Sequence, residues 1–158
     1  MKSSDIEYQI DGVRYVGHMA EPDGTDLRPA VLVCHEAPGL TDHAKGRARR
    51  IADELGYVAF ALDYWGDGKP LPADTLWPTF EKLRADKALT RQRATAGLDV
   101  LLAHPRADRS RVASIGWPCA FASARTVEDA DMTTGTAASS LPHIDSSTAM
   151  TGHSGGTE

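Results

Sequence analysis

The sequence predicts an α/β fold: a mostly parallel sheet with an N-terminal hairpin and flanking helices. Residues 30–34 are continuously apolar, and their lack of alternation is typical of a strand covered on both faces. Residues 57–62 and 111–115 are predicted to be two further buried strands. Segments with helical periodicity separate these strands. This alternation of strand and helix favours parallel strands joined by right-handed crossovers.

Each element follows from a local pattern. Residues 6–10 and 13–16 flank Asp11 and Gly12, a strong two-residue hairpin signal. Asp42 is the expected N-cap of a helix over residues 43–55, whose apolar residues recur at helical spacing and which ends at Gly56.

A loop rich in Gly and Pro covers residues 63–72. Asp74 or Thr75 is the expected cap of a helical region that runs to about residue 103, with a break near residues 87–89. We expect three arginines of this region on a solvated helix face: Arg84, Arg91 and Arg93.

Bulk composition excludes several protein classes. The 158 residues carry a formal net charge of −5, the opposite of what a generic nucleic-acid binder needs. The apolar runs are far shorter than the roughly 20 residues of a membrane helix, and the N-terminus lacks the apolar core of a signal peptide. Two cysteines, Cys34 and Cys119, make no disulfide framework. We therefore expect a cytoplasmic protein with no nucleic-acid or membrane partner.

The chain divides into two unequal parts. Residues 1–117 contain 32 large apolar or aromatic residues, whereas residues 120–158 contain 4 among 39, of which 24 are Ser, Thr, Ala or Gly. A segment of that composition buries too little surface to offset its ordering entropy. We therefore treat residues 1–117 as part of an α/β domain, and residues 118–158 as an atypical tail that we expect to be poorly ordered.

Candidate functional residues follow the strands, because open α/β sheets bind ligands beyond the carboxyl ends of their strands. The segments in that position are residues 34–39, 63–66 and 116–119. The last has Gly116 at the end of a strand and Cys119 shortly after it, which is the setting of a nucleophile elbow. The N-terminus of a helix after such a turn lowers a thiol pKa and offers N–H groups to an oxyanion.

Taken together, these segments resemble the dienelactone hydrolase family, a branch of the α/β-hydrolase superfamily with a cysteine nucleophile. The resemblance covers roughly residues 5–117. It is carried by residues 33–40, the helix segment 48–52, residues 56–59, the Asp-Tyr-Trp-Gly loop within 62–66, and residues 108–116.

The resemblance implies a hydrolase of small lactones or carboxylic esters that needs no cofactor. Cys119 would be the nucleophile, and Glu36 would take the thiol proton when substrate arrives. The backbone N–H groups of Ala37 and Ala120 would form the oxyanion hole. A histidine and an aspartate would complete the triad.

The chain departs from the family pattern after the predicted elbow strand. The family has Gly-x-Cys-x-Gly-Gly, whereas residues 116–121 place Cys119 one position late, after a proline, and lack both following glycines. None of the acidic or histidine residues in the tail has the strand-end context of a triad member. We therefore expect the N-terminal part only of a family domain, truncated or frame-disrupted after the elbow strand. Its sheet is an incomplete α/β-hydrolase sheet with an exposed apolar edge. Such an edge is an aggregation hazard and allows homo-oligomers to form, so that dimer, aggregate and monomer all stay open.

Several residues have more than one interpretation. Glu36 is a catalytic neighbour or an ionised strand-end residue that faces solvent. Cys119 is a nucleophile or a half-buried thiol, and the whole chain is an active hydrolase or an inactive relative. Cys34 is expected to be structural, and no ligand set at zinc-like spacing accompanies it. Trp65 and Trp77 line a pocket or pack against the sheet.

Overall fold

The structure, a computed structural model, describes residues 1–116. The elements in chain order are β1 (Lys2–Ile10), β2 (Val13–Glu21), β3 (Arg28–Cys34), α1 (Asp42–Leu55), β4 (Val58–Ala61), α2 (Ala73–Ala85), α3 (Lys87–Ala103) and β5 (Ala107–Gly116). The predicted α/β fold class is confirmed. The interpretation of residues 118–158 as a poorly ordered tail lies outside the described residues.

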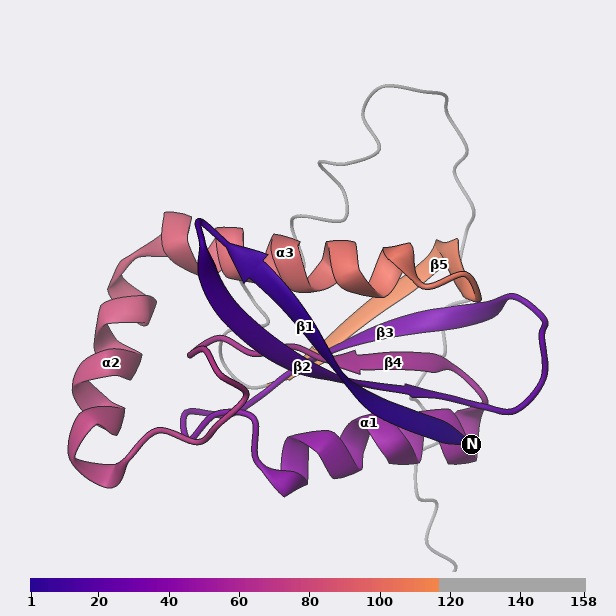
Figure 1. The fold of residues 1–158 in the computed structure, drawn as a ribbon, viewed down its shortest axis with the longest axis horizontal. Coiled ribbons are helices and arrows are strands. Elements are labelled where there is room, and N and C mark those ends of the chain that lie inside the picture. Colours follow the sequence, from indigo (N-terminus) through magenta and orange to yellow (C-terminus); the bar gives the residue numbers. More distant parts are fainter. Residues whose placement is uncertain (117–158) are drawn as a thin grey trace, which may run out of the picture.

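Five strands form one sheet in the order β1-β2-β4-β3-β5. β3 pairs in parallel with β4 and β5, while β2 pairs antiparallel with β1 and β4. Helix α1 covers one face of the sheet and α3 covers the other (Figure 1). No helix within residues 1–116 is long and apolar enough to cross a membrane.

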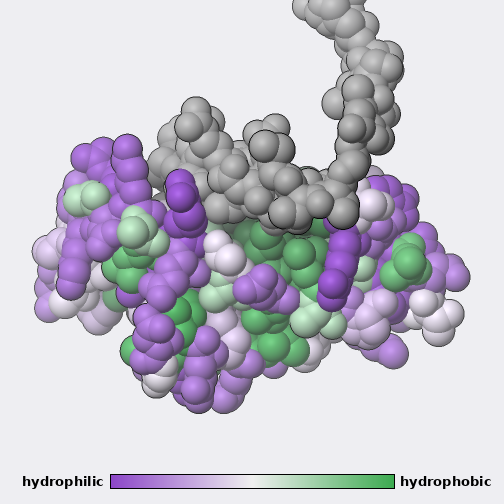
Figure 2. Space-filling model, turned by 90° about the horizontal axis from the view of Figure 1, so that it is seen from above, coloured by the Kyte–Doolittle hydropathy of each residue, from purple (hydrophilic) through white to green (hydrophobic). Residues whose placement is uncertain are grey.

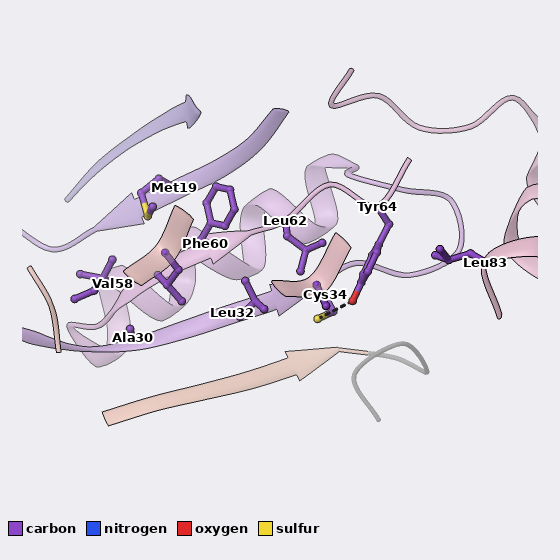
Figure 3. Packing of buried hydrophobic residues seen from close by; sticks show 12 residues of the cluster. Met19, Ala30, Leu32, Cys34, Val58, Phe60, Leu62, Tyr64 and Leu83 are labelled. Atoms are coloured by element: carbon purple, nitrogen blue, oxygen red, sulfur yellow. Dashed lines mark hydrogen bonds between the residues drawn. The ribbon is translucent and has the colours of Figure 1, made fainter. Parts of the chain in front are cut away.

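Alternate residues of β3 point into two separate cores, which explains the uninterrupted apolar run of this strand. Val31 and Val33 pack with buried residues of α1, among them Ala48 and Ile51. On the opposite face, Leu32 belongs to a second cluster of buried residues. The members labelled in Figure 3 are Met19, Ala30, Leu32, Cys34, Val58, Phe60, Leu62, Tyr64 and Leu83.

The helix caps differ from the expectation. Thr41, not Asp42, occupies the N-cap position of α1, and Asp42 is the first helical residue. An aspartate there still favours the helix, because its charge faces the positive end of the helix dipole. Pro72 precedes α2. The helix break falls at Asp86, whose side chain accepts a hydrogen bond from the Leu89 N–H at 2.9 Å and so caps α3.

Strand β5 is less buried than its sequence indicates. It is an edge strand within the described part of the chain, and most of its residues are exposed or half-buried, Ile115 among them at 37% exposure. Figure 2 shows hydrophobic residues gathered near the centre of one face between hydrophilic flanks. Self-association through the β5 edge stays a prediction.

Gly17 of β2 provides a test of the packing between β2 and β4. A Cβ atom at residue 17 would lie 2.5 Å from Phe60 Cε2 and 2.8 Å from the Ala61 carbonyl oxygen. We predict that Gly17→Ala lowers the free energy of unfolding by about 1–3 kcal/mol, because the core must shift to admit the methyl group. Urea unfolding measures the change.

Gly46→Ala is the matched control. Gly46 lies inside α1, and the nearest atom to its added Cβ is Arg49 Nη2 at 3.8 Å. There alanine should stabilise the protein by up to about 1 kcal/mol. Equal stability of Gly17→Ala and the unaltered protein would contradict the packing described above.

Candidate active site

The carboxyl ends of β3, β4 and β5 meet at one edge of the sheet. Cys34, the last residue of β3, is opposite Gly116, the last residue of β5. The Leu62 N–H, just beyond β4, donates to the Val33 carbonyl at 3.1 Å. The sequence segments that follow β3 and β4 therefore lie beside each other, as predicted, and β5 leads to the same edge. Cys119 and Ala120 lie outside the described residues.

Gly116 is required by the close approach of β5 to β3. Its φ is +153°, and a Cβ atom there would lie 2.6 Å from Cys34 Cβ. A side chain at residue 116 would collide with the end of β3. Gly116 is the last residue of β5, as predicted, and the turn predicted after it lies outside the described residues.

Cys34 belongs to the core. Its side chain is fully buried, and the Tyr64 hydroxyl donates to its Sγ at 3.5 Å (Figure 3). The expected structural role agrees with this position. No group of three or more metal-ligating side chains occurs in the described part of the chain.

Asp63 organises the loop after β4, a role that the sequence analysis did not predict. Its carboxylate is fully buried. Oδ1 accepts from the Trp65 and Gly66 N–H groups at 2.9 and 3.0 Å. Oδ2 accepts from the Val16 and Gly68 N–H groups at 3.2 and 2.8 Å. One side chain therefore holds the loop in a tight turn and fixes it to β2.

Tyr8 of β1 reinforces this turn. Its hydroxyl accepts from the Asp63 N–H at 3.1 Å and donates to the Asp63 carbonyl at 3.0 Å. Burial raises the pKa of Tyr8 well above its usual range, so the hydroxyl keeps its proton at neutral pH. The hairpin is therefore part of the support of the site.

His35 connects the ends of β3 and β4. It is buried, and its Nε2 accepts from the Tyr64 N–H at 3.1 Å. Its Nδ1 lies 2.7 Å from the Glu36 carbonyl oxygen. Because an amide N–H only donates and a carbonyl only accepts, these partners assign the proton to Nδ1. Burial lowers the pKa of His35, which keeps the ring neutral.

Glu36 points toward α1 and is 30% exposed. Its Oε1 lies 3.1 Å from Arg47 Nη2 and 3.7 Å from His43 Nε2, both from the first two turns of α1. This carboxylate is therefore neither free in solvent nor sealed in the core. Its position leaves both interpretations of Glu36 open.

The backbone at Ala37 is fixed by hydrogen bonds on both sides. The Glu36 carbonyl accepts from the Gly39 N–H at 3.0 Å, and the Ala37 carbonyl accepts from Trp65 Nε1 at 3.1 Å. A Cβ atom at Gly39, where φ is +111°, would lie 2.7 Å from the Trp65 ring. Trp65 therefore packs against the loop of residues 36–39.

Trp77 and the arginines have different surroundings. Trp77 is 63% exposed and lies against the Phe80 ring. Arg84 is on the solvated face, as expected, and pairs with Glu81. Arg93 corrects the expectation, because it donates to the Tyr64 carbonyl and lies over an aromatic ring of β2 at 5.7 Å.

A family model decides the relationship of the chain. The model of the dienelactone hydrolase family matches residues 16–142, which is most of the sequence. The chain belongs to the dienelactone hydrolase family. This confirms the membership that the strand-end segments predict.

Solved structures of dienelactone hydrolases share this fold. A dienelactone hydrolase-like promiscuous phosphotriesterase from metagenomic libraries is 39% identical with a TM-score of 0.73, and the match covers 79% of this chain and 54% of that chain. A dienelactone hydrolase from Anabaena variabilis is 16% identical with a TM-score of 0.53, over 73% of this chain and 51% of that chain. The chain thus spans about half the length of these two structures.

One curated relative matches a shorter stretch. A Saccharolobus solfataricus protein assigned as a carboxymethylenebutenolidase is 42% identical over 57 residues, which is 36% of this chain and 21% of the relative. The chain therefore covers about a fifth of that protein.

Replacing the Asp63 carboxylate tests its organising role. We predict that Asp63→Asn lowers the free energy of unfolding by about 3 kcal/mol or more, because an amide nitrogen would face two of the four N–H donors. Chemical denaturation measures the loss. Asp67→Asn is the matched control in the same loop, where the side chain is exposed and asparagine tolerates the φ of +57°. A similar small effect at both positions would argue against the role of Asp63.

The buried His35 ring should make stability depend on pH. Its pKa lies below the ordinary 6.5 in the folded state, so below about pH 6.5 the unfolded chain takes up a proton that the folded chain refuses. The free energy of unfolding should therefore fall as pH falls below 6.5, by up to about 1.4 kcal/mol per pH unit from this residue. His35→Asn should flatten this dependence between pH 8 and 5. Unchanged slopes in paired denaturation curves would count against a neutral buried ring.

Proposed function

We propose that this protein is a hydrolase of small carboxylic esters or lactones that uses Cys119 as its nucleophile. Membership of the dienelactone hydrolase family supports hydrolase chemistry in general. The observation that carries the finer proposal is the convergence of Glu36, Ala37 and Gly116 at one edge of the sheet.

Chain connectivity is compatible with this assignment. Three residues lead from Gly116 to Cys119, and three extended residues span about 11 Å at most. Gly116 pairs with Cys34, which stands two residues before Glu36. The length of this segment therefore allows the approach of the Cys119 thiol to Glu36 and Ala37 that the proposal requires.

The proposed chemistry has two halves. Glu36 takes the proton of the Cys119 thiol, and the thiolate attacks the ester carbonyl carbon. The C–S bond forms while the carbonyl electrons move to oxygen, where the Ala37 and Ala120 N–H groups stabilise the charge. Collapse breaks the C–O bond, and the leaving alkoxide takes the proton that Glu36 holds. Water then attacks the thioester, the C–S bond breaks, and the carboxylic acid leaves with the Cys119 thiol restored. The histidine and aspartate of the family triad are not assigned to residues of this chain.

The contacts of Glu36 are compatible with a carboxylate that leaves Arg47 and His43 to take a proton from a thiol. Arg47 and His43 hold its carboxylate near the N-terminal end of α1, where it is partly exposed. Pairs of this exposure contribute only about 0–1 kcal/mol, so the carboxylate turns toward a thiol at small cost. No cofactor enters the proposal, and the substrate is a small molecule.

Ester turnover by the full chain tests the proposal. We predict that the protein hydrolyses a chromogenic short-chain ester and a dienelactone, and that Cys119→Ser lowers kcat at least about 100-fold because an alcohol is a far weaker nucleophile at neutral pH. Glu36→Gln should lower kcat as well. A phosphotriester serves as an additional substrate, because the 39% identical structure is a promiscuous phosphotriesterase.

Cys34→Ala is the control for this experiment. It removes a buried core thiol, leaves Cys119 in place, and should preserve turnover at a temperature where the variant stays folded. Absence of turnover, or turnover that Cys119→Ser leaves unchanged, would refute the proposal and favour a catalytically inactive relative.

A further inference from the structure

We infer that His35 is a positioning residue: its Nδ1–H holds the Glu36–Ala37 peptide so that the Ala37 N–H faces the oxyanion. The inference rests on the proposed function, because it assigns a role within the same site. The strand-end motif by itself does not predict this positioning role, because the His35 ring is buried.

Peptide geometry connects the two groups. The Glu36 carbonyl and the Ala37 N–H belong to one peptide unit, and the described residues contain no cis peptide bond. In a planar trans peptide the C=O and N–H bonds point in opposite directions. A hydrogen bond that fixes the carbonyl therefore fixes the direction of the N–H.

Two donors hold this carbonyl. The His35 ring lies 2.7 Å away through Nδ1, and the Gly39 N–H donates at 3.0 Å. The Gly39 bond closes the turn, while the His35 bond comes from the buried side and sets the tilt of the peptide plane. Both ring positions of His35 are determined, because the Tyr64 N–H occupies Nε2 at 3.1 Å.

The surroundings of the ring make this arrangement rigid. His35 is 2% exposed and packs edge-on against the Tyr64 ring with centroids 5.3 Å apart. The Trp65 ring lies 5.6 Å from it and donates to the next carbonyl, that of Ala37. The two consecutive carbonyls of the loop are thus each held by one ring: that of Glu36 by His35, and that of Ala37 by Trp65. Preorganised donors of this kind act most strongly in the transition state.

Two variants separate the Nδ1–H from the rest of the ring. His35→Asn keeps an N–H donor near the position of Nδ1, whereas His35→Leu has none, and both lose the acceptor for the Tyr64 N–H. We expect His35→Leu to lower kcat for the chromogenic ester by about 10- to 100-fold with KM nearly unchanged, and His35→Asn to recover most of that loss. Equal kcat in the two variants would overturn the inference.

Spectroscopy tests the inference without turnover. Long-range ¹H–¹⁵N spectra of the unaltered protein should show His35 as the neutral Nδ1–H tautomer. The Ala37 amide and Glu36 carbonyl shifts should move in His35→Leu and return toward the native values in His35→Asn. An Nε2–H tautomer, or equal shifts in both variants, would overturn the inference.

The two proposals fail in different ways. If the unaltered protein shows no turnover that depends on Cys119, the proposed function fails. The tautomer and the amide shifts then still decide whether His35 holds the peptide. The tautomer measurement needs no substitution, so the test does not depend on the folding of His35→Leu.

Discussion

The site depends on one buried carboxylate. Asp63 accepts hydrogen bonds from four backbone N–H groups, and a charge removed from water is tolerated only when its hydrogen-bonding capacity is met in this way. The turn that it creates fixes the positions of the next two residues, Tyr64 and Trp65. The Tyr64 N–H is thereby aimed at His35, and the Trp65 indole at the Ala37 carbonyl.

The order of the sheet explains why such an anchor is needed. β4 has only four residues, between β2 and β3, and the loop after it must pass the hairpin before α2 begins. Tyr8 and Val16 contribute from β1 and β2, so the antiparallel hairpin braces the end of a parallel strand. The hairpin thus contributes to the site through the Tyr8 hydroxyl and the Val16 N–H.

Sequence patterns predict the elements of this fold whose buried residues recur at regular spacing. The paired apolar runs of β3 and β4 and the helical spacing in α1 follow from burial on one or two faces, and the strand-end position of Glu36 follows from the parallel order. The roles of Asp63, His35 and Arg93 could not be predicted in this way. Each is a polar side chain with at least one partner from a distant segment: Val16 is 47 residues from Asp63, and Tyr64 is 29 residues from His35. Periodicity carries no information about such pairs.

Edges and caps are the other features that sequence predicts poorly. Residues 111–115 are predicted to be a buried strand, yet the exposure of β5 depends on which elements flank it in space. At the start of α1, Thr41 and Asp42 are both good capping types, so one residue of register decides between them.

The buried thiol of Cys34 can report local opening of the sheet at the carboxyl end of β3. Its Sγ accepts a hydrogen bond from the Tyr64 hydroxyl and lies in the core on the α3 side of the sheet. A thiol reagent reaches such an atom only when the structure around the carboxyl end of β3 opens. The rate of Cys34 modification therefore measures how often this edge of the sheet, which also holds Glu36 and Ala37, opens locally.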